Sequence, residues 1–162
     1  MEQDWRSHLR DLDRKLAAQA WKCHRMGVPV PGDLADLVSC MQHHTEWHAI
    51  WDGLATAQDT GVVIETEDGP VNPLLHVHMD AVVKRQLALN DPPAIRFVFN
   101  LLESQGVGEF DAYHVIARAL VGEMWEIMKY DRPFDEARYT SKAKQYANED
   151  LRRRNESRRG PG

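Results

Sequence analysis

The stretch Met41-Gln42-His43-His44-Thr45-Glu46-Trp47-His48-Ala49-Ile50-Trp51 decides how this chain is expected to fold. Around it, apolar residues or histidines recur every three or four positions, at Leu34, Leu37, Met41, His44, His48, Trp51 and Ala55. This spacing is typical of one face of an amphipathic helix, and it predicts a long helix from Asp33 to about Gln58. His44 and His48 then stand one turn apart where core leucines normally stand, so we expect both to be largely buried.

A buried imidazole needs a hydrogen-bond partner or a metal ion. Two histidines four residues apart on one helix can hold one transition-metal ion, but a protein site needs three or four ligands. Further candidates at the edges of other predicted helix cores are His76 with Asp80, and His114 with Asp111 or Glu123. Helical bundles build metal sites from inward side chains in this way. In the alternative interpretation the histidines are structural, satisfied by backbone carbonyls or by Asp80 and Glu46.

Composition narrows the class of protein. The chain has 162 residues, 43% hydrophobic and 28% charged, which predicts a soluble globular domain with a real core. A net charge of -5 argues against a nucleic-acid binder, and no apolar run is long enough to span a bilayer. The N-terminus lacks the pattern of a signal peptide, so Cys23 and Cys40 are expected to be reduced thiols in the cytoplasm.

Hydrophobic periodicity and breaker residues divide the chain into further elements. A first amphipathic helix is predicted from about Asp4 to Met26. Residues 61–70 read as a short extended segment or hairpin. Later helices are expected to begin at Asn72-Pro73, at Asp91-Pro92-Pro93, near Glu109 and near Phe134. The prediction is therefore an all-α, single-domain bundle of about five helices plus a C-terminal helix or tail.

The end of the chain is strongly basic. Five arginines fall between residues 151 and 162, with almost no apolar residues among them. We expect residues 1–150 to form the domain and residues 151–162 to be a disordered tail, because such a segment buries little apolar surface. An arginine-rich tail is usually a solvated end, and an anionic partner is the alternative.

Several motifs carry a resemblance to a known family. In order along the chain they are His44-Thr45-Glu46-Trp47-His48, Asn72-Pro73-Leu74-Leu75-His76-Val77-His78-Met79, Asp91-Pro92-Pro93, Asp111-Ala112-Tyr113-His114 and Gly122-Glu123-Met124-Trp125. This set resembles a family of small bacterial proteins known only as a domain of unknown function. Its members usually show H-P-E-Y-H, N-P-x-L-H-x-x-M-H, D-x-P-P and H-E-A-x-H. The resemblance spans residues 31–139 and implies His44, His48, His76 and His114 as site residues, without implying a reaction.

The chain departs from that pattern at three positions. Asp80 stands where the family usually has a second histidine, and a carboxylate can still bind a metal ion. Lys84 stands where a glutamate is common, and Phe110 stands at the first histidine of H-E-A-x-H; neither is an ordinary metal ligand. Where relatives hold two metal ions, this chain is expected to hold one or none.

Two classes of function remain open. The first is a transition-metal site built from His44, His48, His76, Asp80 and His114, in a metal-binding protein or a metal-dependent enzyme. Mixed nitrogen and oxygen ligands suit zinc, iron or manganese, and Glu46 or Glu123 is a candidate base. The second class is a non-catalytic interaction or adaptor protein with structural histidines. The partner is a small molecule or a protein, rather than nucleic acid or membrane, and the oligomeric state stays open.

Overall fold

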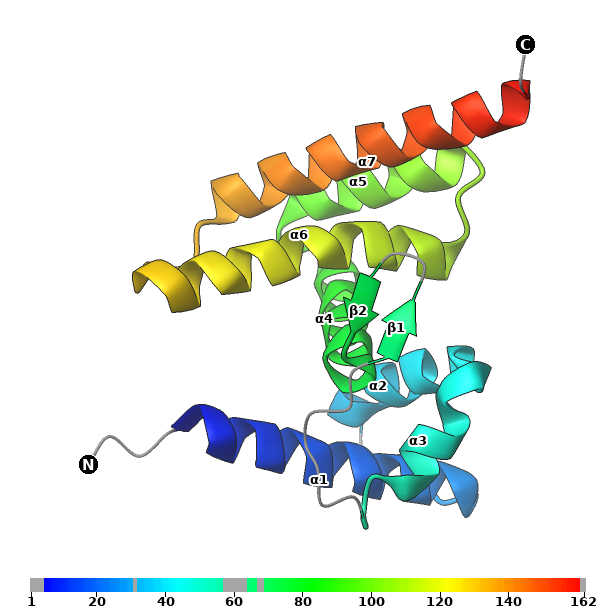
Figure 1. Cartoon of the computed structure of the whole chain (residues 1–162), viewed down its shortest axis with the longest axis vertical. Helices are drawn as coiled ribbons and strands as arrows, with labels where there is room; N and C mark the ends of the chain where they lie inside the picture. Colours follow the sequence, from blue (N-terminus) through cyan, green and yellow to red (C-terminus); the bar gives the residue numbers. More distant parts are fainter. Residues whose placement is uncertain (1–4, 31, 57–63, 67–68, 161–162) are drawn as a thin grey trace. The chain divides into compact units, whose positions relative to one another are not determined.

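The computed structural model describes residues 5–30, 32–56, 64–66 and 69–160. Within those ranges it is all-α apart from one two-stranded antiparallel hairpin, which confirms the predicted fold class (Figure 1). None of the helices in these ranges is long and apolar enough to cross a membrane. The elements are α1 (Trp5–Arg25), α2 (Gly32–His43), the 3-10 helix η1 (Thr45–Trp47), α3 (His48–Gly53), β1 (Ile64–Thr66), β2 (Gly69–Val71), α4 (Pro73–Leu89), α5 (Pro93–Ser104), α6 (Glu109–Tyr130) and α7 (Glu136–Arg159).

The chain divides into two compact units, residues 1–81 and 82–162, and the boundary falls within α4. In the first unit α1 packs against α2 and α3. Aromatic and aliphatic side chains fill the space between these helices because their apolar faces are excluded from water. The buried core residues here are Ala17, Ala20, Trp21, Leu37, Val38, Cys40, Met41, Trp47, Trp51 and Leu54.

The prediction of one continuous helix from Asp33 to Gln58 is wrong. α2 ends at His43, and His44 leaves helical geometry with φ −86° and ψ 73°. The chain then makes one turn of 3-10 helix, closed by a hydrogen bond from the Trp47 amide to the His44 carbonyl. Residues 57 and 58 lie outside the described residues. His44 and His48 are therefore not on one helical face, although apolar spacing continues across the break.

The break is stabilised by side chains of α3 that reach back to α2. The Trp51 Nε1–H donates to the Met41 carbonyl at 3.0 Å, and His48 Nε2 lies 3.1 Å from the Gln42 carbonyl. A helix leaves its last four carbonyls without partners inside the helix, and these two bonds satisfy two of them. α3 thus serves as the C-terminal cap of α2, which a continuous helix would not need.

The segment before α4 follows the sequence prediction. Ile64 pairs with Val71 and Thr66 with Gly69 in the β1–β2 hairpin; residues 61–63 and 67–68 of the predicted segment lie outside the described residues. Asn72 Oδ1 accepts a hydrogen bond from the Leu75 amide, and Pro73 occupies the first helical position. Both residues favour the start of a helix. The asparagine oxygen pairs with an amide of the first turn, and proline has no amide hydrogen to leave unpaired there.

The second unit is built from α5, α6 and α7, which pack on one another (Figure 1). Gly106, with φ +81°, follows α5, and Asp131 ends α6 in the left-handed conformation. The Tyr139 hydroxyl donates to Gln86 Oε1 at 2.6 Å, linking α7 to the second half of α4. The buried residues between these helices include Ile95, Val98, Leu102, Ile116, Leu120, Tyr139, Ala143 and Ala147.

α7 continues to Arg159, so residues 151–159 are helical where the composition predicted disorder. Asp135 caps the helix by accepting from the Arg138 amide, and Ala143 and Ala147 are fully buried. Composition underestimated this segment because it counts apolar residues and omits ion pairs made within a helix. Residues 161 and 162 lie outside the described residues, and the single-domain boundaries stay a prediction.

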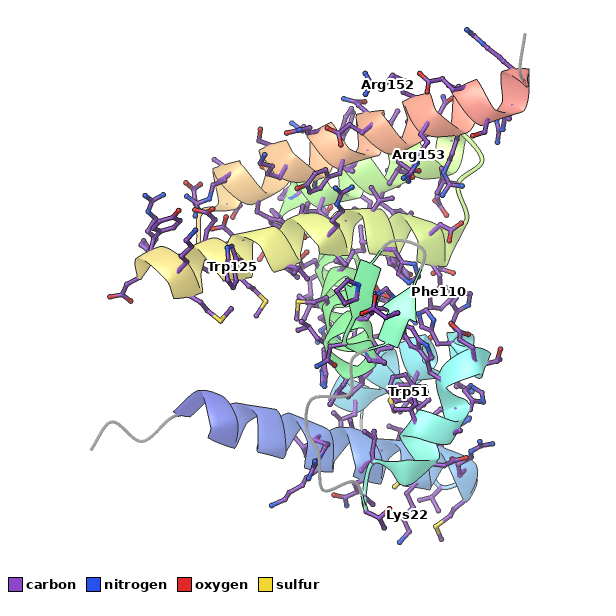
Figure 2. The ribbon with its side chains drawn as sticks, viewed as in Figure 1. Lys22, Trp51, Phe110, Trp125, Arg152 and Arg153 are labelled. Carbon is purple, nitrogen blue, oxygen red and sulfur yellow. The ribbon has the colours of Figure 1, made fainter. Side chains whose placement is uncertain are left out.

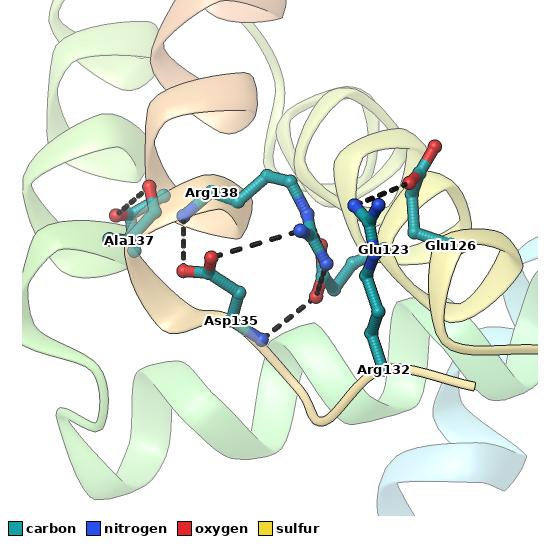
Figure 3. A network of polar contacts seen from close by, with 7 residues as sticks. Glu123, Glu126, Arg132, Asp135, Ala137 and Arg138 are labelled. Carbon is teal, nitrogen blue, oxygen red and sulfur yellow. Dashed lines mark hydrogen bonds and ion pairs between the residues drawn. The ribbon is translucent and has the colours of Figure 1, made fainter. Parts of the chain in front are cut away.

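Glu123 is a buried carboxylate on α6, 3% exposed, at the centre of a polar network (Figure 3). Arg138 donates to it from Nε and Nη2, each at 2.7 Å, and the Asp135 amide donates at 2.8 Å. The hydrogen bonds from Arg138 lower the pKa of Glu123 and outweigh burial, which acts in the opposite direction. Glu123 is therefore an ionised structural residue, which disfavours its predicted role as a base.

The capping bond of Trp51 predicts a measurable loss of stability. Trp51→Phe removes the donor to the Met41 carbonyl and leaves a buried acceptor unpaired, at a cost of about 1–3 kcal/mol. The matched control is Trp125→Phe, because Trp125 on α6 is 57% exposed while Trp51 is 1% exposed. Urea denaturation of both variants measures the difference. Equal unfolding free energies for the two variants would contradict the capping role.

The Glu123–Arg138 pair predicts a pH dependence of stability. Because the pKa of Glu123 is lower in the folded protein, the pair stabilises the fold above the ordinary glutamate pKa of 4.5, and this stabilisation is lost as pH falls through the folded-state pKa. Glu123→Gln should cost about 2–3 kcal/mol at neutral pH, since Arg138 is partly exposed. The free energy of unfolding of the Glu123→Gln variant should also change less than that of the wild type as the pH falls.

The control for that measurement is Glu126→Gln, which removes a second, exposed ion pair with Arg132 at 3.8 Å (Figure 3). Exposed pairs contribute about 0–1 kcal/mol, so this variant should unfold almost like the wild type. Chemical denaturation at several pH values between neutrality and pH 3 compares the three proteins. A Glu123→Gln curve parallel to the wild-type curve throughout would show that the pair does not set the acid dependence.

Candidate metal centre

Three residues of the first unit converge on one point. His44 occupies the break between α2 and η1, while His76 and Asp80 stand one turn apart on α4. His76 Nε2 lies 3.3 Å from Asp80 Oδ2, and His44 Nε2 lies 4.0 Å from the same oxygen. Each residue offers one possible ligand atom, and these atoms all lie within 4.8 Å of one another. The group could hold a metal ion.

Asp80 is the most deeply buried of the three, with no exposed surface. An ionised carboxylate away from water is costly unless it is paired or binds a metal ion. Both imidazoles present Nε2 toward it, so ring nitrogens that could bind a metal ion flank the aspartate on two sides. The spacing of His76 and Asp80 on one helical face, which the sequence predicts, is confirmed by this contact.

His44 is oriented by a second carboxylate. Its Nδ1 lies 2.9 Å from Glu46 Oε1, which fixes the imidazole with Nε2 directed at Asp80. Burial lowers the pKa of His44, but the nearby carboxylate of Asp80 and the hydrogen bond to Glu46 outweigh it, so the pKa is raised above 6.5. Glu46 correspondingly has a lowered pKa, because its bond to His44 outweighs the effect of burial.

Trp47 forms an aromatic wall beside the two histidines. Its ring stacks on His44 at a centroid distance of 4.3 Å and an angle of 15°. The same ring meets His76 edge to face at 5.3 Å and 90°. Trp47 is itself buried and packs on Trp51, so the wall belongs to the core of the first unit. Such packing limits the rotation of both imidazoles.

The spacing of these atoms could accommodate a metal ion after a small adjustment. Bonds of about 2.0–2.2 Å to nitrogen and oxygen place neighbouring ligand atoms of a tetrahedral site about 3.3–3.5 Å apart. The separation of His76 Nε2 and Asp80 Oδ2 already matches that spacing, and the separation of His44 Nε2 from the same oxygen must shorten by about 0.5 Å. The hydrogen bond that the far nitrogen of His44, Nδ1, donates to the Glu46 carboxylate is the arrangement by which metal-binding histidines are usually oriented.

The structure does not bring His48 to this group, which corrects the prediction that His44 and His48 act as a pair on one helix. A carbonyl only accepts hydrogen bonds, so Nε2 of His48 must be protonated to bond to Gln42. Its ring packs against Trp21 with centroids 5.0 Å apart. His48 is thus held as a cap of α2 in the arrangement described here.

The remaining candidates belong to the second unit. His114 is half-buried on α6, and its part in the site stays a prediction. Asp111 faces Arg154 at 3.6 Å, and Glu123 is held by Arg138. Both carboxylates proposed as companions of His114 therefore have cationic partners.

Sequence reasoning did not assign Trp47 a role at the site and gave Glu46 only general ones, as a partner for structural histidines or a base. The signal for Glu46 is its place two residues after His44, within reach of the imidazole once the helix is broken. Nothing in the local sequence distinguishes Trp47 from an ordinary core tryptophan, because its role depends on His76 from α4.

Comparison with known proteins supports the family resemblance. A family model described as a domain of unknown function, DUF1841, matches residues 9–145. No curated protein and no solved structure matches the chain. The matched range covers most of the chain and contains His44, His76, Asp80 and His114. The chain therefore belongs to the DUF1841 family, a domain of unknown function.

Proposed function

We propose that this protein binds one transition-metal ion through His44, His76 and Asp80. The observation that carries the proposal is the fully buried Asp80 carboxylate, which faces an imidazole Nε2 at 3.3 Å and another at 4.0 Å. Two imidazoles and one carboxylate form a donor set that suits zinc, iron or manganese. The same donors leave coordination positions open.

His114 enters the proposal as a fourth ligand from the sequence alone. It closes the motif Asp111-Ala112-Tyr113-His114, at the position of a histidine in H-E-A-x-H, and borders the predicted core stripe of its helix. Four protein ligands are typical of structural zinc sites, whereas three ligands leave room for water. An open position would permit a metal-dependent enzyme, in which zinc activates water or iron binds oxygen.

The alternative is an interaction or adaptor protein in which the histidines are structural. The raised pKa of His44 favours this reading to some degree, because an imidazolium beside Asp80 and Glu46 forms an ion pair without any metal. The two readings predict different responses to substitution. If these residues are metal ligands, substituting one should abolish metal binding and leave most of the helix intact. If they form a structural ion pair, the substitution should leave a buried carboxylate unpaired and lower the stability of the protein.

The cellular setting belongs to the proposal as well. Cys23 and Cys40 form no disulfide with each other in the structure, which supports a cytoplasmic location. A small molecule reaching open positions on the metal is the partner that fits this site. A fractionation experiment with the tagged protein tests the location independently of metal binding.

Metal content is the direct test. The purified protein should contain or take up close to one zinc, iron or manganese ion per chain, measured by elemental analysis and calorimetric titration of the metal-free protein. His76→Ala and Asp80→Asn should each weaken binding by more than about 100-fold, because removing a ligand costs more than removing its outer partner. His114→Ala should weaken binding only if that residue is a ligand.

His24→Ala is the matched control, since His24 is a histidine of the same unit that lies on α1, with its Nε2 3.1 Å from Gln42 Nε2 rather than at the site. It should bind metal as the wild type does. Circular dichroism checks that each variant keeps its helices. If thoroughly washed wild-type protein holds none of the three metals and takes up none at micromolar concentrations, the proposal fails and the structural reading replaces it.

Glu46, whose carboxylate is hydrogen-bonded to His44 Nδ1, gives a second prediction. Glu46→Gln keeps the size and an acceptor oxygen but removes the charge that makes the imidazole a better ligand. Metal affinity should fall by about 10–100-fold, the usual effect of losing such an outer partner. The control is Glu103→Gln, an exposed glutamate on α5. Unchanged affinity in Glu46→Gln, measured by competition with a chelator, would mean that the bond to Nδ1 does not tune the site.

A further inference from the structure

The last turns of α7 form a basic surface that the proposed metal site does not involve. A shallow, open pocket there is lined by Asp150, Arg153, Arg154, Ser157 and Arg158. Its lining carries three guanidinium groups and one carboxylate, for a local charge of +3 − 1 = +2. This surface lies wholly within the second unit, on a chain whose net charge is -5.

Asp150 holds two of the arginines in place. It is buried, and it accepts from Arg153 Nη2 at 2.8 Å and from Arg154 Nε at 2.5 Å. Burial raises the pKa of Asp150, but the bonds from Arg154 and Arg153 outweigh it, so the pKa is lowered and the carboxylate stays ionised. A guanidinium has five N–H donors, so both arginines keep donors beyond those that Asp150 uses.

Arg158 supplies a cation that forms no ion pair with the residues that the structure describes. It is four residues after Arg154 and hence on the same helical face, where like charges repel. Among residues 69–160, no ion pair joins Arg158 to a carboxylate, whereas Arg154 is paired with Asp150 and with Asp111 at 3.6 Å. Its Nη2 lies near the α5–α6 turn, 3.9 Å from where a Cβ would stand at Gly106. An anion between these guanidiniums would remove the repulsion.

Basic residues near a helix C-terminus also interact favourably with the helix dipole, and this alone accounts for Arg158 and Arg159 in the last turn. The dipole does not account for Arg153 and Arg154, which stand further from the end and are fixed by a buried carboxylate. Such fixing reduces the entropy lost on binding a ligand, because the donors are already oriented. The pocket therefore has the features of a binding site rather than of a solvated helix end.

We infer that the pocket of Arg153, Arg154, Ser157 and Arg158 binds a single phosphoryl group, as inorganic phosphate or as a small phosphate ester. Planar guanidinium groups match the oxygen geometry of phosphate, and the Ser157 hydroxyl, which donates to the Arg153 carbonyl at 3.0 Å, lines the same pocket. The negative charge of the whole chain disfavours a long polyanion and leaves a compact dianion as the ligand that this small basic surface fits.

The test is a titration of the full-length ¹⁵N-labelled protein, following the Nε–Hε signals of Arg154 and Arg158 by nuclear magnetic resonance. Inorganic phosphate and glycerol 3-phosphate are the two probes, and sodium chloride at equal ionic strength controls for screening. Saturable shifts with either probe support the inference. Binding of the free ion alone identifies inorganic phosphate as the ligand, and binding of the ester alone identifies an organic phosphate.

Two charge-matched variants decide whether the pocket itself is responsible. Arg158→Gln removes a lining residue, while Arg152→Gln removes an equal charge from a residue that does not line the pocket and lies on a different side of α7 from Arg153 (Figure 2). Both side chains are exposed, so neither change disturbs packing. Arg158→Gln should weaken binding about tenfold, the effect of one charge-assisted hydrogen bond, and Arg152→Gln should have little effect. Equal losses in the two variants, or equal shifts with chloride and phosphate, would overturn the inference.

Discussion

The burial of Asp80 is the constraint on which the first unit depends. A carboxylate with no exposed surface must be matched by positive charge, by donors or by a metal ion, and here two imidazoles are placed to meet it. His76 comes from the same helix, so its position follows from helical geometry alone. His44 comes from another part of the chain and reaches Asp80 only because α2 stops at His43.

The candidate site therefore exists only because α2 is interrupted. Breaking a helix exposes carbonyl groups that need new partners, and Trp51 and His48 supply them from α3. The same break turns His44 toward α4 and lets Glu46 reach its other nitrogen. A residue that looked like half of a metal-binding pair, His48, contributes instead by making the break stable.

Buried carboxylates recur in the second unit with different partners. Glu123 faces Arg138, and Asp150 faces Arg153 and Arg154. Guanidinium groups remain protonated at any ordinary pH, so these ion pairs persist wherever the carboxylates are ionised. An imidazole, by contrast, can be neutral near physiological pH and can then bind a metal ion. The chemical difference between arginine and histidine is what separates a structural network from a candidate metal centre in this chain.

Much of the fold could be predicted from the sequence by itself. Apolar spacing, proline positions and the Asn72 cap are local signals, and they determined the helical class and the starts of α4, α5 and α6. The pairing of His76 with Asp80 was predictable for the same reason, because four residues on one helix fix a contact. Membership of a family of unknown function was likewise predicted from the sequence and is confirmed by the family match.

Tertiary structure decided the rest, because it depends on residues distant in sequence. Apolar spacing runs unchanged through His44, so no local signal distinguishes one long helix from α2, η1 and α3. Two interactions favour the interrupted helix instead. Trp51 and His48 hydrogen-bond to carbonyl groups of α2, and Asp80 attracts His44. In the same way, composition alone marks residues 151–159 as a polar tail. The buried Asp150 and the contacts of α7 with α5 and α6 make that segment a helix and gather its arginines at one pocket.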